Sequence, residues 1–119
     1  MPKEKYRWYK VAEAGEQMVE EGSMRIIEVN NKKISLARWN QSLYAFGYKC
    51  PHAGGILSDG YLDPSGIIVC PLHRYKYNIK NGFNVSGEGF YMKTFPVELR
   101  SDGIYVGIEH SSLWDIFRE

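Results

Sequence analysis

A chain of 119 residues with a formal net charge of +1 can form one domain with a buried core and is too short for two. The near-neutral charge argues against nucleic acid as a partner, because nucleic-acid binding calls for a concentrated basic surface. No apolar run reaches the length of a transmembrane helix, and the charged stretch 1–7 lacks the apolar core of a signal peptide. We therefore expect a soluble, cytoplasmic protein that does not enter a membrane, in a compartment where structural disulfides are rare.

Short runs rich in β-branched and aromatic residues, separated by turn residues, dominate the chain. They predict eight strands, at 7–11, 24–29, 33–39, 43–48, 67–70, 75–79, 92–95 and 104–108. Because Asn and Gly tolerate positive φ, tight turns are predicted at Asn30-Asn31, Asn81-Gly82 and Asp102-Gly103. The polar stretch 13–21 fits either one turn of helix or a loop, and 91–93 fits either strand or loop. The fold class indicated is all-β, as a sandwich or a small open barrel.

Both cysteines of the chain stand next to a histidine in sequence. Cys50-Pro51-His52 has the pattern C-x-H and Cys70-Pro71-Leu72-His73 the pattern C-x-x-H. Two thiolates and two imidazoles suit a metal centre, although plain buried thiols, a disulfide or a zinc site are the alternatives. Structural zinc sites usually group cysteines with cysteines and histidines with histidines, whereas each loop here mixes the two. The pattern therefore favours iron–sulfur over zinc.

In this arrangement the chain resembles the Rieske [2Fe–2S] proteins, in which each loop gives one Cys to the first iron and one His to the second. The resemblance extends over most of the chain, and most clearly over 43–106. It implies that one [2Fe–2S] cluster per chain is held by Cys50, His52, Cys70 and His73. It also implies one domain, 1–119, with a β-sandwich base and a smaller cluster-binding lobe at about 47–79.

The ligand loops also select a branch of this family. Members of the high-potential branch have an extra Cys in each loop, forming a disulfide beside the cluster, and a membrane tether; neither is found here. In that branch a Ser and a Tyr, two and four residues after the last His, donate hydrogen bonds to sulfur. The matching residues are Tyr75 and Tyr77, so the serine donor is absent. The resemblance thus implies a low-potential ferredoxin, in which Tyr77 either bonds a sulfur or only packs inward.

One position departs from the family pattern. The residue after the last histidine is usually Gly, and here it is Arg74. Either the backbone has an ordinary conformation there or the turn is rebuilt.

The resemblance implies a function as a one-electron carrier, with no catalytic residues. The expected donor is a NAD(P)H-dependent flavoprotein reductase and the expected acceptor an oxygenase. An oxygenase subunit would need a further 2-His-1-carboxylate iron site, and only His110 remains unassigned. Two alternatives stay open: a small Rieske-like subunit of a nitrite-reductase-type enzyme, and a structural metal-binding interaction module.

Two surface segments each have two interpretations. The stretch 111–119 resembles a capped amphipathic helix, which either docks on a partner or, as we favour, covers an apolar edge of its own sandwich. The segment 47–80 has four basic and two acidic residues, a charge of +2, whereas 81–119 has three basic and six acidic, a charge of −3. The basic lobe either guides an acidic partner or is simply solvated.

Overall fold

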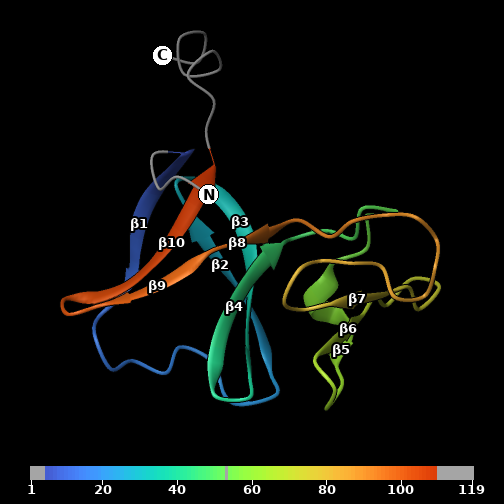
Figure 1. Ribbon diagram of the computed structural model, residues 1–119, viewed down its shortest axis with the longest axis horizontal. Coiled ribbons are helices and arrows are strands. Elements are labelled where there is room, and N and C mark those ends of the chain that lie inside the picture. The colour runs from blue at the N-terminus through green and yellow to red at the C-terminus, as the bar shows by residue number, and fades with distance from the viewer. Residues whose placement is uncertain (1–4, 53, 110–119) are drawn as a thin grey trace, which may run out of the picture.

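The computed structural model describes residues 5–52 and 54–109. Within these residues the chain forms three small antiparallel sheets (Figure 1). The strands are β1 (Tyr6–Ala12), β2 (Met24–Val29), β3 (Lys32–Trp39), β4 (Ser42–Gly47), β5 (Tyr61–Leu62), β6 (Ile67–Val69), β7 (Lys76–Asn78), β8 (Thr94–Phe95), β9 (Val97–Arg100) and β10 (Gly103–Glu109). The predicted all-β class is confirmed.

Two of the sheets form the base of the molecule. Their strand orders are β1-β10-β9 and β2-β3-β4-β8. The β2–β3 hairpin turns at Asn30-Asn31, where both residues have positive φ, 52° and 64°. The β3–β4 hairpin does the same at Asn40-Gln41, with φ of 53° and 68°. Positive φ at both central residues gives a turn whose twist matches the flanking strands, which fixes the register of this meander.

The sheet that contains β3 and β4 is covered on both faces. Since successive side chains of a strand point to opposite faces, Ile34 and Leu36 pack into the core between the two base sheets. Ala37 and Phe46 face the other way, into a second core. This explains why β3 is buried continuously from Ile34 to Ala37 rather than at alternate positions.

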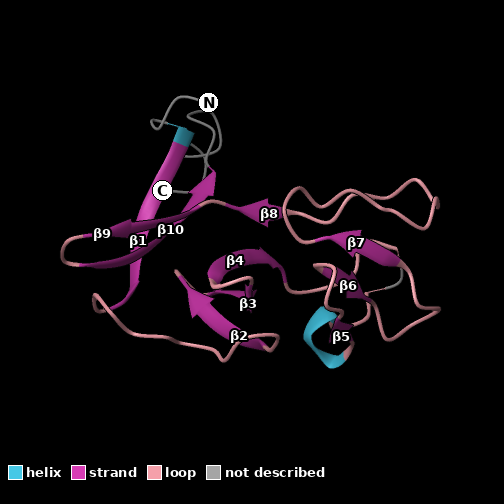
Figure 2. Ribbon diagram, turned by 60° about the horizontal axis from the view of Figure 1, so that its bottom comes forward, coloured by secondary structure: helices cyan, strands magenta, loops and turns pink. Residues whose placement is uncertain are grey.

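The second core belongs to a lobe at one end of the base, which Figure 2 shows beside β4 and β8. The lobe contains the sheet β5-β6-β7 and the short 3-10 helix η2 (Leu57–Asp59). Its buried residues beyond Ala37 and Phe46 are Cys50, Leu57, Ile68, Cys70, Tyr77, Ile79 and Met92. Because Met92 lies in this core, the lobe extends past the predicted 47–79 to the segment that leads into β8.

The eight predicted strands are all present; 24–29 has the predicted ends, and the ends of the others differ. The predicted 67–70, 75–79 and 92–95 are shorter in the structure, and 13–21 is a loop. Two short strands, β5 and β9, were not predicted as separate elements. The predicted helix at 111–119 and His110 lie outside the described residues. No helix in the part that is described is long and apolar enough to span a bilayer.

Candidate metal centre

The two predicted ligand loops have the same backbone closure. The Cys50 N–H donates to the Gly55 carbonyl at 2.7 Å, and the Cys70 N–H donates to the Tyr75 carbonyl at 2.8 Å. Each cysteine is thus tied to the residue five positions further along the chain. Each cysteine side chain therefore projects from the first residue of a tight loop. The loop at Cys50 follows strand β4, and the loop at Cys70 follows strand β6.

Two glycines let these loops approach each other and the strands below. A Cβ on Gly55 would lie 3.4 Å from the Cys70 sulfur and 2.9 Å from the Leu72 side chain. A Cβ on Gly60 would collide with the Val69 carbonyl oxygen, directly before Cys70. Glycine is therefore a packing requirement at Gly60, whereas a Cβ at Gly55 would force the exposed Leu72 side chain to shift.

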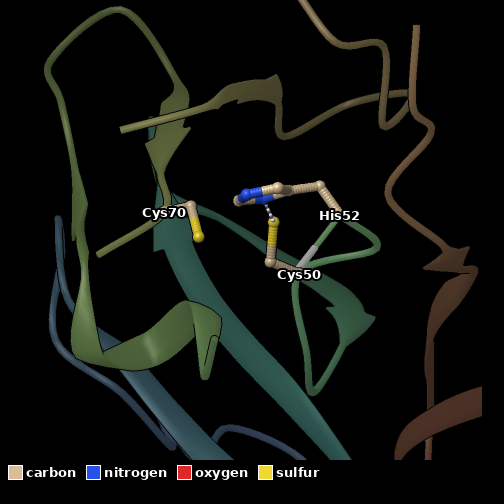
Figure 3. Close-up of side chains that lie close together, drawn as sticks. All are labelled: Cys50, His52 and Cys70. Carbon is tan, nitrogen blue, oxygen red and sulfur yellow. Dashed lines mark hydrogen bonds between the residues drawn. The ribbon is translucent and has the colours of Figure 1, made fainter. Parts of the chain in front are cut away.

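The loops bring the four predicted ligands together. Ligand atoms of Cys50, His52 and Cys70 all lie within 4.8 Å of one another (Figure 3). The Cys50 sulfur is 3.3 Å from His52 Nδ1. His73 lies outside this group of three, but its Nδ1 is 3.1 Å from His52 Nε2. Residues that stand far apart in the sequence thus meet at one end of the lobe.

The four side chains differ in depth. Cys50 and Cys70 are buried, 2% and 0% exposed, whereas His52 is half-buried and His73 exposed. Burial, assisted by the contact with Cys50, raises the pKa of the Cys70 thiol to about 11. A thiolate at this depth therefore needs a positive partner, which a metal ion provides. The cysteines form no disulfide.

The donor set fits a [2Fe–2S] cluster bound by two cysteines and two histidines. Such a cluster needs two thiolates on one iron and two imidazoles on the other. Both sulfurs lie on the buried side of the site and both imidazoles on its outer side.

Tyr77 lies directly beneath the site. Its side chain is fully buried, and its hydroxyl oxygen is 3.2 Å from the Cys50 sulfur. Burial, followed by the hydrogen bond to Cys50, raises the pKa of Tyr77 far above its ordinary value. The hydroxyl therefore keeps its proton, and it is the donor whenever Cys50 is a thiolate. Of the two readings of Tyr77, the geometry favours the bond to sulfur.

The turn after the last histidine answers the question raised by Arg74. His73 and Arg74 both have positive φ, 60° and 57°. The backbone therefore has the left-handed conformation that glycine adopts most easily, with an arginine in its place. An ordinary conformation at this position is excluded.

Two aromatic side chains surround His52. The Tyr75 ring stacks on the imidazole with centroids 3.8 Å apart and an interplanar angle of 27°. Phe90 is near both rings, 5.8 Å from His52 and 6.0 Å from Tyr75. The sequence drew attention to Tyr75 only as a missing serine and not at all to Phe90. The contact joins segments that only the folded lobe brings together.

Fold and site together define an electron-transfer protein with an iron–sulfur centre. The chain matches the Rieske [2Fe-2S] domain over residues 7–95 and belongs to this family. Its cofactor is therefore a [2Fe–2S] cluster, as predicted.

Two curated relatives show how the domain is used elsewhere. The ferredoxin component of an alkene monooxygenase system from Xanthobacter autotrophicus is 21% identical over 89 residues, 75% of this chain and 73% of that protein. Human apoptosis-inducing factor 3 is 32% identical over 80% of this chain, which spans only 16% of that protein. The ferredoxin relatives are electron-transfer components, and this chain is likewise an electron carrier rather than an enzyme.

Solved structures have the same fold. A chain in the complex of oxygenase and ferredoxin of carbazole 1,9a-dioxygenase superposes with a TM-score of 0.73 and 28% identity, over 87% of this chain and 95% of that one. The putative NADH-dependent nitrite reductase small subunit from Mycobacterium tuberculosis gives a TM-score of 0.74 at 16% identity, over 89% and 98% of the two chains. The second likeness concerns the fold alone.

Proposed function

We propose that Cys50, His52, Cys70 and His73 hold the cluster, and that the chain passes single electrons from a NAD(P)H-dependent flavoprotein reductase to an oxygenase. The observation that carries this proposal is the difference in depth between the buried cysteines and the outer histidines. Ferredoxin components of oxygenase systems among the relatives support the choice of acceptor.

The bound cluster would supply one-electron chemistry, formally neutral when oxidised and −1 when reduced, since two ferric ions, two sulfides and two thiolates sum to zero. The protein's residues set the conditions for it. Cys50 and Cys70 bind on the buried side, and Tyr77 donates a hydrogen bond to the Cys50 sulfur. His52 and His73 bind on the outer side, so that an acceptor reaches an imidazole edge without opening the lobe.

The surface around the site suits a transient partner. Exposed cations flank it at Lys49, Arg74 and Lys76, and Leu72 presents an apolar side chain that is 43% exposed. A mixed surface of this kind favours rapid association guided by charge, with an acidic patch on the oxygenase as its counterpart. As expected from the sequence, we also propose that residues 1–119 form one domain and that the protein works in the reducing cytoplasm. Two free thiols persist in such a compartment.

The direct test is to purify the protein without oxygen and to measure iron, sulfide and zinc. We expect about two irons and two acid-labile sulfides per chain, an EPR signal after reduction, and nitrogen couplings from two imidazoles. Cys50→Ser and Cys70→Ser should lose the cluster, while Ser58→Ala, which removes a half-buried hydroxyl of η2, should keep it. Stoichiometric zinc without visible absorption would contradict the proposal.

The acceptor is tested separately. Reduced protein mixed with an oxygenase in a stopped-flow instrument should reoxidise rapidly, and more slowly at high salt. Stable co-purification with a nitrite reductase would instead make the chain a permanent subunit of that enzyme.

A further inference from the structure

The environments of the two outer histidines differ. His52 lies face to face with the Tyr75 ring at 3.8 Å. Among the residues that the structure describes, the ring neighbours of His73 are tilted and more distant, with centroids 5.3 Å away at His52 and 6.3 Å away at Tyr75. Accordingly His52 is half-buried and His73 is exposed. The imidazole of His52 is covered by an aromatic ring, whereas the imidazole of His73 is open to water.

A second aromatic ring, that of Phe90, lies beside the Tyr75 ring that covers His52. Phe90 lies within 6.0 Å of the Tyr75 ring and 5.8 Å of the His52 ring. Its own side chain is 36% exposed, so it forms the outer rim of the group. Two aromatic rings from different segments thus lie beside the same imidazole.

The position of Phe90 is fixed by a buried asparagine. Asn84 is 4% exposed, and its amide donates to the Lys76 carbonyl at 3.1 Å and to Glu88 Oε1 at 2.9 Å. Its side-chain oxygen accepts the Gly89 N–H at 2.9 Å. The turn that ends at Phe90 is therefore tied to β7, the strand that follows Tyr75. Both rings of the cover are anchored to the same strand.

We propose that Tyr75, backed by Phe90, is a positioning residue that covers His52, excludes water from it and thereby lowers the reduction potential of the cluster. This inference rests on the proposed function, because it takes His52 to be a ligand. The centre gains a negative charge on reduction, and removing water from its surroundings disfavours the charged form. The apolar shell around a metal site controls solvent access and potential in the same way.

The test compares reduction potentials of the cluster-loaded protein by protein-film voltammetry at one pH. Tyr75→Ala removes the ring and should shift the potential to more positive values. Tyr75→Phe keeps the ring without its hydroxyl and should leave the potential unchanged. Phe90→Ala should give a smaller positive shift. Phe83→Ala is the control: it removes an exposed ring that packs on Tyr91 and should give no shift.

Pulsed EPR of the same samples separates the possible failures. Two nitrogen couplings in every variant, with Tyr75→Ala at the wild-type potential, would overturn the cover and leave the proposed function intact. Fewer than two nitrogen couplings in the wild type would overturn the proposed ligand set instead. If Tyr75→Phe shifted as far as Tyr75→Ala, the hydroxyl and not the ring would be responsible. If Tyr75→Ala lost its cluster, Phe90→Ala would provide the test instead. A reduction potential of Phe90→Ala equal to that of Phe83→Ala would refute the proposal that the rings over His52 lower the potential.

Discussion

At the scale of single residues, the Tyr77 hydroxyl is placed to tune the cluster. It lies 3.2 Å from the Cys50 sulfur and is buried with it. Reduction adds negative charge, so the hydrogen bond is stronger in the reduced state and raises the potential. A net contribution of about 1 kcal/mol corresponds to about 40 mV for one electron. Tyr77→Phe should therefore lower the midpoint potential by some tens of millivolts.

The control for this change is Tyr105→Phe, because the Tyr105 hydroxyl bonds Asp102 in the base and not the cluster. It should leave the potential unaltered. An unshifted Tyr77→Phe with a full cluster would mean that Tyr77 contributes packing only.

Arg74 has a different effect, on stability. A non-glycine residue at φ of 57° is strained by about 1–2 kcal/mol, while glycine costs about 0.5–1 kcal/mol in chain entropy. Arg74→Gly should therefore stabilise the cluster-loaded protein by up to about 1.5 kcal/mol, seen as a higher denaturation midpoint. Arg74→Ala keeps the strain and should not. Lys76→Gly, within β7, should destabilise, since it adds flexibility to a strand.

At the scale of elements, the approach of η2 and β5 to β6 depends on Gly60. Any Cβ there meets the Val69 carbonyl, the last backbone oxygen before Cys70. Gly60→Ala should displace the end of β6, and with it the proposed ligand Cys70, so that iron and sulfide per chain fall well below two. Gly47→Ala is the matched control, because its added Cβ would meet only ordinary contacts at 3.7–3.9 Å. A full cluster in Gly60→Ala would show that the backbone adapts.

The strands could be predicted from the sequence because they are local patterns, and the ligand loops are proposed on a pattern of the same kind. The turn at Asn30-Asn31 and the pairing of Cys with His within each loop are visible over a few residues. The turn at Asn40-Gln41 was missed because Gln rarely adopts positive φ, and its conformation is imposed by the pairing of β3 with β4. The cover over His52 could not be predicted, since it needs Tyr75 and Phe90 to meet across the folded lobe.

At the scale of the whole molecule, the sheet of β3 and β4 is common to both cores. Leu36 faces the base and Phe46 faces the lobe, and the two lie on neighbouring strands. Loss of either core should therefore unfold both. Leu36→Ala should cost about 2–5 kcal/mol and should lower the denaturant midpoint of cluster absorbance and of strand circular dichroism by the same amount.

A surface leucine provides the control for the predicted joint unfolding of the two cores. Leu99 is 73% exposed, and Leu99→Ala should move neither midpoint appreciably. Cluster absorbance that disappears before the strand signal in Leu36→Ala would show that the lobe opens on its own.

The closure of the two ligand loops bears on the speed of electron transfer. Each proposed cysteine ligand is fixed by its own backbone hydrogen bond to the residue five positions further along the chain, and this bond uses no atom of the metal centre. Little backbone rearrangement is then required when an electron arrives or leaves. A site that is organised in advance has a low reorganisation energy. The rate of transfer should then depend mainly on how closely a partner approaches the exposed edge of the proposed ligand His73.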